Sequence, residues 1–113
     1  MQSRFRLRIG NDPESSLGPG KVALLEAIEE TGSISAAGRK LGMSYRRAWL
    51  LVDALNHAFN QPLITTATGG REGGGTALTP SGADVVRRYR RIEAMATAAT
   101  AREINALQKL MRG

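Results

Sequence analysis

Two helical patterns separated by a single glycine constrain the fold of this chain more than any other feature of its sequence. Ser33 is a residue type that caps helices, and small or apolar residues then recur at helical spacing until Gly42 interrupts them. Ser44 can cap a second helix, whose buried side is marked by apolar residues at helical spacing. These residues are Ala48, Leu51, Val52, Leu55 and Phe59. Because Gly38 allows the two helices to cross closely, the pattern predicts a helix-turn-helix.

The segment before this unit predicts one strand and one helix. Residues 4–9 alternate strictly between basic and apolar side chains, which is typical of a half-buried strand. The apolar face of this strand consists of Phe5, Leu7 and Ile9. A turn-rich connection then leads to a helical pattern over residues 22–31, which Gly32 can end in the left-handed conformation.

The segment after the helix-turn-helix predicts a hairpin and a long helix. Residues 63–78 contain two short β-prone runs on either side of a seven-residue, glycine-rich tip, which is the pattern of a hairpin with a flexible end. Thr79 and Pro80 then supply an N-cap and a first helical residue. The apolar spacing of this last helix continues to about Met111.

This order of elements predicts a mainly α fold with a small β-hairpin wing, which is a winged helix-turn-helix with a long C-terminal dimerisation helix. A chain of 113 residues fits a single domain. Residues 1–79 form the predicted winged helix-turn-helix DNA-binding domain. Residues 80–113 form the C-terminal helix, which we expect to serve as a dimerisation element of the same domain.

The charge of the chain indicates a polyanionic partner. The formal net charge is +6, and residues 33–91 hold nine Lys and Arg residues against three acidic ones. A generic basic surface is the alternative, but it would not require this concentration of charge in the middle of the chain. Double-stranded DNA is therefore the expected partner.

The composition also excludes several kinds of site. The chain has no cysteine and a single histidine, so thiolate or histidine clusters cannot form, and we expect no metal and no cofactor. The sequence shows neither paired carboxylates nor a nucleophile–base pair, so we do not expect an enzyme. No apolar run approaches the length of a membrane span, and the N-terminus lacks the apolar core of a secretory signal. We therefore expect a cytoplasmic protein without membrane contact.

The second helix of the predicted motif would enter the DNA major groove with its N-terminal turn. Arg46 or Arg47 can donate two hydrogen bonds to the O6 and N7 atoms of guanine, whereas hydroxyl groups suit phosphate oxygens. The predicted DNA-binding residues are Ser33, Ser35, Ser44, Tyr45, Arg46, Arg47, Thr68, Gly70 and Arg71. The alternative is an ordinary pair of core helices with solvated arginines.

Two other side chains of this helix are expected to have structural roles. Trp49 lies beside the buried face, and we expect it to fill the domain core rather than to stack on a base. His57 has no catalytic partner within reach in the sequence, and we expect a surface or half-buried imidazole.

The glycine-rich tip predicts a wing rather than a nucleotide-binding loop. A P-loop requires Gly-Lys-Ser/Thr at its end, and the lysine is missing from Gly74-Gly75-Thr76. A dinucleotide-binding fingerprint would lead into a helix, whereas this loop leads into a β-prone run. Arg71 at the tip would enter a minor groove or contact a phosphate; a merely flexible tip is the alternative.

The last helix carries an apolar stripe that suits a homodimer. Its predicted dimerisation residues are Val85, Tyr89, Ile92, Ala96, Ala99, Ile104 and Leu107. Packing of the same stripe against its own domain is the competing interpretation. The basic run that opens this helix, Arg87, Arg88, Arg90 and Arg91, fits either a solvated face or additional phosphate contacts.

Two stretches resemble one known family. Residues 31–49 contain Gly-Ser-Ile-Ser and Ser-Tyr-Arg-Arg-Ala-Trp, and residues 67–79 contain Gly-Gly-Arg-Glu-Gly-Gly-Gly. In combination these strings resemble the DNA-binding domain of the molybdate-responsive transcriptional regulators of the ModE type. A looser similarity to the LysR-type winged helices involves Leu41, Ser44 and residues 78–82.

The resemblance implies a homodimeric repressor or activator that places the helix beginning at Tyr45 and the wing around Arg71 on DNA. Members of the family carry C-terminal oxyanion-binding domains that have no counterpart in these 113 residues, so we expect no molybdate pocket here. The prediction is a sequence-specific DNA-binding transcription regulator without molybdate-binding domains. The alternative is a protein-interaction module that docks to a separate oxyanion-binding partner.

Overall fold

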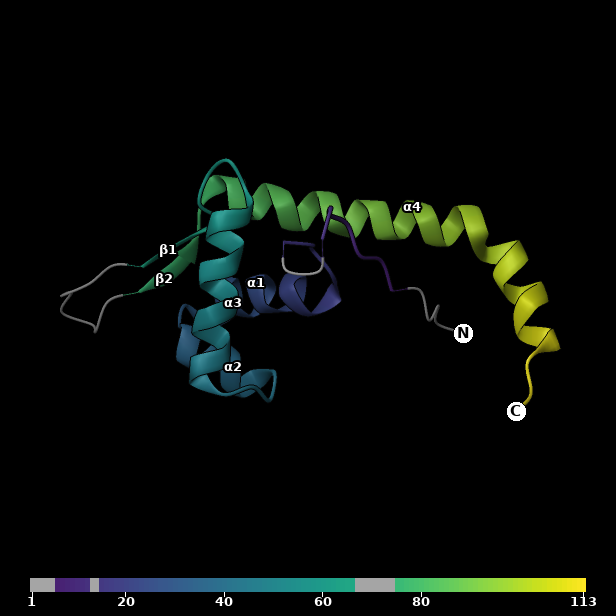
Figure 1. The fold of residues 1–113 in the computed structure, drawn as a ribbon, viewed down its shortest axis with the longest axis horizontal. Coiled ribbons are helices and arrows are strands. Elements are labelled where there is room, and N and C mark those ends of the chain that lie inside the picture. Colours follow the sequence, from purple (N-terminus) through teal and green to yellow (C-terminus); the bar gives the residue numbers. More distant parts are fainter. Residues whose placement is uncertain (1–5, 13–14, 67–74) are drawn as a thin grey trace.

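The computed structural model describes residues 6–12, 15–66 and 75–113 of the chain. These residues form a mainly helical structure with a two-stranded antiparallel sheet (Figure 1). The elements in chain order are α1 (Pro19–Thr31), α2 (Ile34–Lys40), α3 (Tyr45–Ala58), β1 (Ile64–Thr66), β2 (Thr76–Leu78) and α4 (Pro80–Leu110). The predicted fold class, a winged helix-turn-helix followed by a long C-terminal helix, is confirmed.

Hydroxyl groups at the predicted positions cap three of the helices. Ser33 Oγ accepts a hydrogen bond from the Ala36 amide at 3.1 Å, and Ser44 Oγ accepts one from the Arg47 amide at 3.1 Å. Thr79 begins α4 in the same way. Each cap satisfies an amide that the helix leaves unpaired, which is worth about 1 kcal/mol. These local bonds set the first residues of α2, α3 and α4.

The hydrophobic core surrounds α1. Four of its side chains are completely buried, namely Val22, Leu24, Leu25 and Ile28. The buried sides of α2 and α3, the strand residues Leu63 and Ile64, and Tyr89 of α4 belong to the same cluster. Helix α1 is thus the central support against which the helix-turn-helix packs.

Gly38 lies where α2 and α3 cross, as the sequence predicts. A Cβ atom on this residue would lie 3.3 Å from the Ala48 Cβ and 3.4 Å from the Met43 carbonyl oxygen. These distances are shorter than most packing contacts, so a side chain here would push the two helices apart.

The predicted N-terminal strand is wrong for the residues that the structure describes. Ile9 forms an isolated antiparallel bridge with Leu17, with N–H to O distances of 2.8 and 2.6 Å, and residues 6–8 are not in a strand. Leu7 is half-buried, but Ile9 is 42% exposed. The chain turns back on itself at Gly10 (φ 147°) and brings Leu17 beside Ile9, but in the described part of the chain this pairing does not extend to residues 6–8. Phe5 lies outside the described residues.

Helix α4 passes over the core and then continues beyond it (Figure 1). It bends in its last turns, and the Thr100 hydroxyl donates a hydrogen bond to the Ala96 carbonyl oxygen at 2.6 Å, a type of contact that often bends helices. None of the helices in the described part of the chain is both long and apolar enough to cross a membrane.

One of the predicted dimerisation residues, in the first half of α4, is buried in its own chain. Tyr89 is only 1% exposed, and its hydroxyl donates a hydrogen bond to the Leu7 carbonyl oxygen at 2.6 Å, so it belongs to the core of its own chain. Val85 is half-buried and packs against the same core. Beyond this point Ile92 is 43% and Leu107 is 58% exposed. The apolar spacing continues through both parts, which is why the sequence did not separate them.

Candidate nucleic-acid interface

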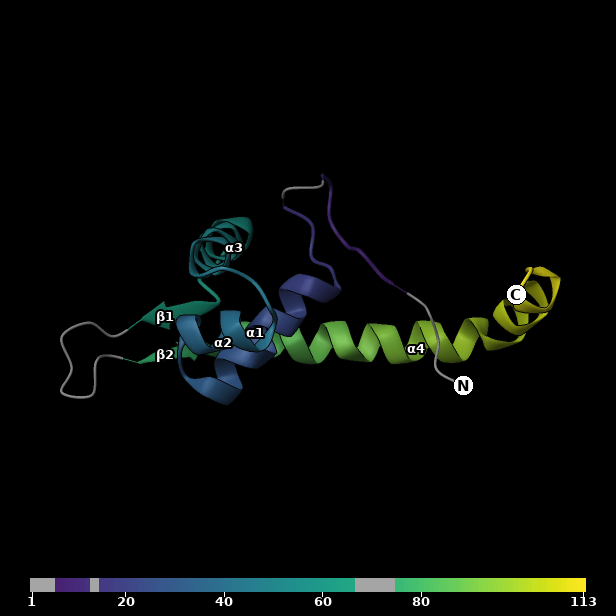
Figure 2. The ribbon, with the colours of Figure 1, turned by 90° about the horizontal axis from the view of Figure 1, so that it is seen from below.

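Helix α3 presents an open outer side. Ala48, Val52 and Leu55 are buried against the core, and the opposite side faces away from the molecule. Figure 2 shows α3 standing apart from the layer that contains α1, α2 and α4. The second helix of the helix-turn-helix is therefore accessible along its length to a groove of DNA.

The two predicted base-contacting arginines are exposed and available. Within the part of the chain that the structure describes, neither guanidinium of Arg46 and Arg47 has a hydrogen-bond or ion-pair partner. Other cations nearby are already occupied: Lys40 pairs with Glu30, and Arg39 donates to Ser35 Oγ at 3.0 Å. The cations of α3 thus remain free to bind an external anion.

The predicted hydroxyl groups lie at the starts of α2 and α3. Ser33 and Ser44 use their oxygens as helix caps, while Ser35 accepts from Arg39. A hydroxyl that accepts a hydrogen bond can still donate its own proton, so all three keep a donor for a phosphate oxygen. The Tyr45 side chain is 58% exposed.

The wing is described at its base. Strands β1 and β2 pair in the register Ile64↔Leu78, Thr65↔Ala77 and Thr66↔Thr76. The Thr76 amide donates to the Gly32 carbonyl oxygen at 3.0 Å, which joins the hairpin to the end of α1. The predicted wing residues Thr68, Gly70 and Arg71 lie outside the described residues.

Asn56 connects the wing to α3, a role that the sequence analysis did not assign. Its Oδ1 accepts hydrogen bonds from the amides of Leu63 and Ile64 at 2.9 and 3.0 Å, and its Nδ2 donates to the Ile64 carbonyl oxygen at 3.1 Å. The amide group therefore pairs with the backbone as a neighbouring strand would. An asparagine at the end of a helix, just before a proline-containing turn and a β-prone run, is the signal that could have indicated it.

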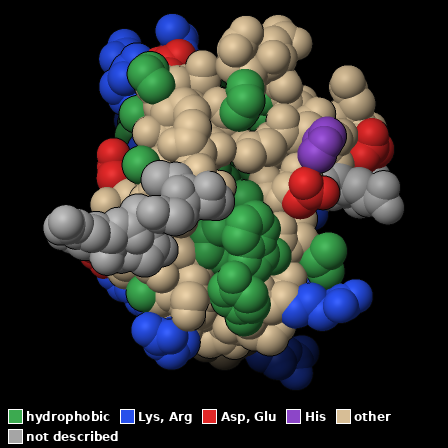
Figure 3. Space-filling model, turned by 90° about the vertical axis from the view of Figure 1, so that its left-hand side faces the viewer, with side chains coloured by type: hydrophobic (Ala, Val, Ile, Leu, Met, Phe, Trp, Pro, Cys, Tyr) green, Lys and Arg blue, Asp and Glu red, His purple; other side chains and the backbone are tan. Residues whose placement is uncertain are grey.

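The expectation that Trp49 fills the core is wrong. It is 39% exposed and packs edge-to-face with Tyr45, with ring centroids 6.3 Å apart and planes at 79°. Because each helical residue turns by about 100°, Trp49 points well away from the buried side that Ala48 marks. Leu50 is 58% exposed. Apolar side chains gather on the face at the wing end of the molecule (Figure 3).

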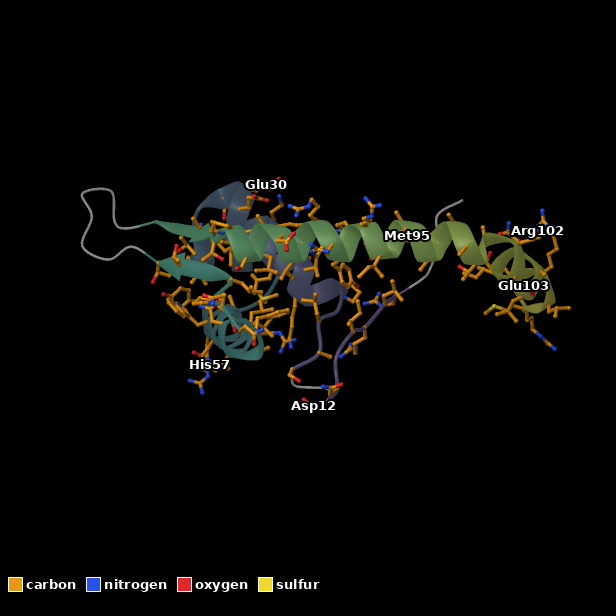
Figure 4. The ribbon with its side chains drawn as sticks, turned by 90° about the horizontal axis from the view of Figure 1, so that it is seen from above. Asp12, Glu30, His57, Met95, Arg102 and Glu103 are labelled. Atoms are coloured by element: carbon orange, nitrogen blue, oxygen red, sulfur yellow. The ribbon has the colours of Figure 1, made fainter. Side chains whose placement is uncertain are left out.

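Negative charge lies on the other side of the domain. Figure 4 shows Glu30 of α1 and His57 of α3 on opposite sides of the molecule. Glu26 of α1 is held by Arg90, with Oε to guanidinium distances of 2.6 and 2.9 Å. Hydrogen bonds from Arg90 lower the pKa of the Glu26 carboxyl, so this acid stays ionised. Glu26 and Glu30 of α1 are thus paired with cations of their own domain, whereas Arg46 and Arg47 of α3 have no such partner among the described residues.

His57 lies at the surface, as predicted. Its side chain is 77% exposed, and Nδ1 is 3.5 Å from Asp53 Oδ1. In the described ranges, no three His, Asp or Glu side chains come close enough together to hold a metal ion.

Comparison with known proteins agrees with this geometry. Residues 20–83 match the family model of the bacterial regulatory helix-turn-helix proteins, lysR family. The chain belongs to this family. The matched region runs from α1 through the helix-turn-helix and the hairpin to the start of α4, and so contains every element of the interface described above.

Individual relatives identify the type of domain more specifically. The chain is 50% identical over 78 residues to the molybdenum-pterin-binding protein MopB of Rhodobacter capsulatus, and 40% identical over 88 residues to the molybdenum transport protein ModE of Azotobacter vinelandii. It is 33% identical over 89 residues to the DNA-binding transcriptional dual regulator ModE of Escherichia coli K12. These matches cover 69%, 78% and 79% of this chain.

The chain spans about a third of the length of these relatives, with matches over 29%, 33% and 34% of their sequences. In this chain the helix-turn-helix family model matches residues 20–83. The protein therefore carries the DNA-binding domain of a ModE-type regulator.

Proposed function

We propose that this protein is a sequence-specific DNA-binding transcription regulator that inserts α3 into the major groove and forms a homodimer through α4. The observation that carries the proposal is the outer side of α3, where Arg46 and Arg47 are exposed and have no partner among the residues that the structure describes. A helix that keeps two free guanidinium groups on its first turn is arranged to contact the acceptors of guanine.

The remaining predicted residues would fix the position of the protein on DNA. Ser44 and Tyr45 begin α3, and Ser33 and Ser35 lie at the start of α2; these hydroxyl groups would contact the sugar–phosphate backbone. Thr68, Gly70 and Arg71 of the wing would contact the backbone or the neighbouring minor groove. Asn56 would support both groups, since it joins the end of α3 to the base of the wing.

The dimer would form through the distal segment of α4, which we define as residues 92–110. Its proposed contacts are Ile92, Ala96, Ala99, Ile104 and Leu107. Ile92 and Leu107 are largely exposed in the single chain, and burying such side chains between two copies would stabilise the pair. A two-fold dimer would present two α3 helices to two half-sites.

Titration of labelled duplexes by fluorescence anisotropy, with competitor DNA present, tests the DNA-binding proposal. Arg46→Ala or Arg47→Ala should relax the base preference by about 1–3 kcal/mol at one position. Arg112→Ala removes an exposed arginine beyond α4 and should leave the preference unchanged. An unchanged footprint and affinity in both α3 variants would show that α3 is not the recognition helix.

The salt dependence of binding gives a second measurement. If the basic side makes six to eight phosphate contacts, log K should fall with log salt at a slope of about −5 to −7. A flat dependence would contradict the electrostatic part of the proposal.

The names of the relatives suggest which genes to test. MopB and the Azotobacter ModE are named for molybdenum-pterin binding and molybdenum transport, so we propose promoters of molybdenum-uptake genes as targets. Titrations with and without molybdate would show whether the anion affects binding. Capture of a separate oxyanion-binding protein, combined with indifference to specific DNA, would instead favour an interaction module.

A further inference from the structure

Helix α3 carries an apolar patch that its own domain does not cover. The patch consists of Tyr45, Trp49 and Leu50, which are 58%, 39% and 58% exposed. Tyr45 and Trp49 are one helical turn apart and hold each other edge-to-face at 6.3 Å, so the indole has a defined orientation. Exposed apolar side chains that gather on one surface are a common mark of a binding site.

The charges next to the patch limit what can cover it. Arg46 follows Tyr45 directly and lies one helical turn before Leu50, so a cation and an apolar side chain share one side of the helix. Arg47 adds a second free cation. The ligand must therefore present negative charge and apolar groups within a few ångströms of each other.

The DNA major groove meets both conditions. Its edges are lined by phosphates, and its floor carries the 5-methyl groups of thymine, which contact apolar side chains in protein–DNA complexes. A membrane or an acidic protein surface would not also explain why the patch lies on the second helix of a helix-turn-helix. This argument rests on the proposed function and assigns further residues to the same site.

We propose that Trp49 and Leu50, with Tyr45 holding the indole in place, contact thymine methyl groups and so add a preference for thymine to the guanine contacts of the α3 arginines. Leu50 lies on the outer side of the helix and covers one methyl group. Trp49 covers a second methyl group with its ring, and Tyr45 is the positioning residue that orients the indole. Sites selected by this protein therefore contain thymine within about one helical turn of the contacted guanine.

Uracil substitution tests this proposal without altering the protein. Duplexes that bind tightly are first selected from a random pool with the full chain, and each thymine is then replaced in turn by deoxyuridine, which lacks only the methyl group. We expect a three- to fourfold loss of affinity, roughly the effect of one buried methylene, at one or two positions per half-site. Thymines elsewhere serve as internal controls and should show no change.

Variants then assign each methyl contact to a side chain. Leu50→Ala should remove the uracil penalty at one position, whereas Leu50→Met, which keeps the apolar surface, should retain it. Trp49→Ala should remove the penalty at the second position, and Tyr45→Ala should reduce that same penalty. An unchanged melting temperature would confirm that each variant is folded.

The outcomes separate this proposal from the proposed function. Specific binding that is unaffected by uracil at every position overturns the thymine contact and leaves the DNA-binding function intact. A uracil penalty that persists in Leu50→Ala and Trp49→Ala also overturns it. Failure to select any duplex contradicts the proposed function and this inference together. Loss of self-association in Trp49→Ala, with the uracil penalty retained, would show that the patch contacts a second copy instead.

Discussion

The first half of α4, residues 80–91, lies against the rest of the domain, whereas its distal segment extends beyond it (Figure 1). In the first half, Gly82 and Tyr89 are buried, and Arg90 pairs with Glu26 of α1. In the distal segment, Met95, Leu107 and Leu110 are 61%, 58% and 84% exposed. The two halves share one continuous helix but differ in what covers their apolar side.

The difference shows that helix formation and burial have separate causes in α4. The distal segment is rich in alanine, the strongest helix former, and its backbone hydrogen bonds are internal to the helix. Its helical conformation therefore depends less on a neighbouring element than the burial of its apolar side does. Figure 4 shows Arg102 and Glu103 at the far end of the helix, away from the rest of the domain. An exposed apolar stripe on such a segment is the feature that a second copy would cover.

The largest expected effect is a loss of stability when a buried side chain in the first half of α4 is truncated. Tyr89→Ala should lower the free energy of unfolding by about 3–5 kcal/mol, because it leaves a cavity beside α1 and removes the hydrogen bond to Leu7. The loss should be independent of protein concentration. Urea denaturation at several concentrations measures it.

Leu107→Ala is the matched change in the distal segment. It should leave the stability of the monomer nearly unchanged and weaken self-association, which analytical ultracentrifugation measures. Equal losses of unfolding free energy in both variants, at every concentration, would break the comparison, since they would place Leu107 in the folded core.

Gly82→Ala should have the next largest effect. A Cβ atom at this position would overlap the Leu63 carbonyl oxygen and lie 3.0 Å from the Leu63 carbonyl carbon, both backbone atoms with little freedom to move. We expect a loss of about 3 kcal/mol, at the upper end of the usual cost of overpacking. Thermal unfolding would record the change.

Gly20→Ala is the control for this glycine. Gly20 lies in the first turn of α1, and nothing would come within 4 Å of an added Cβ atom. Alanine should therefore be neutral or stabilise the protein by up to about 1 kcal/mol. Similar destabilisation in both variants would mean that α4 is not held tightly against Leu63.

The smallest expected effect concerns the ion pair between α4 and α1. The hydrogen bonds from Arg90 hold the pKa of Glu26 below its ordinary value of 4.5. A carboxyl with a lowered pKa in the folded state stabilises the protein above that ordinary value, and this contribution is lost as the pH falls through the lowered pKa. Because both side chains are 40% exposed, the pair is worth at most about 1 kcal/mol.

Glu26→Gln should thus be less stable than the wild type near neutral pH. The difference should shrink as the pH falls below 4.5, where the wild-type carboxyl also loses its charge. Paired urea denaturation curves across this range provide the measurement. A difference that stays constant with pH would assign the contribution of Glu26 to packing rather than to charge.

The errors of the sequence analysis share a physical cause. Residues 6–9 have the alternation of a strand, but in the described part of the chain only Ile9 forms a β-bridge, with Leu17. Trp49 is a large apolar residue of the type that often fills a core. It points outward because its neighbour Ala48 marks the buried side of α3. Tyr89 has the spacing of a dimer residue, yet α4 still lies over its own core there. In each case the sequence shows the pattern of side chains but not the element that packs against it.

What the sequence determined by itself is the order of the helices and of the hairpin, together with the first residues of α2, α3 and α4. Ser33, Ser44 and Thr79 begin their helices through hydrogen bonds to amides three residues away, and Gly32 closes α1 at a φ of 71°. These are contacts within a few residues, so the local sequence contains everything needed to predict them. The helix-turn-helix and its free arginines follow from the same local rules.

Only the tertiary structure decided which side of each element is covered. The exposure of Trp49, the burial of Tyr89 and the attachment of the wing to Asn56 depend on residues up to 82 positions apart, as in the bond between Tyr89 and Leu7. An apolar periodicity gives the direction of a buried side but not the partner that buries it, because burial depends on how the packed elements are placed around α1.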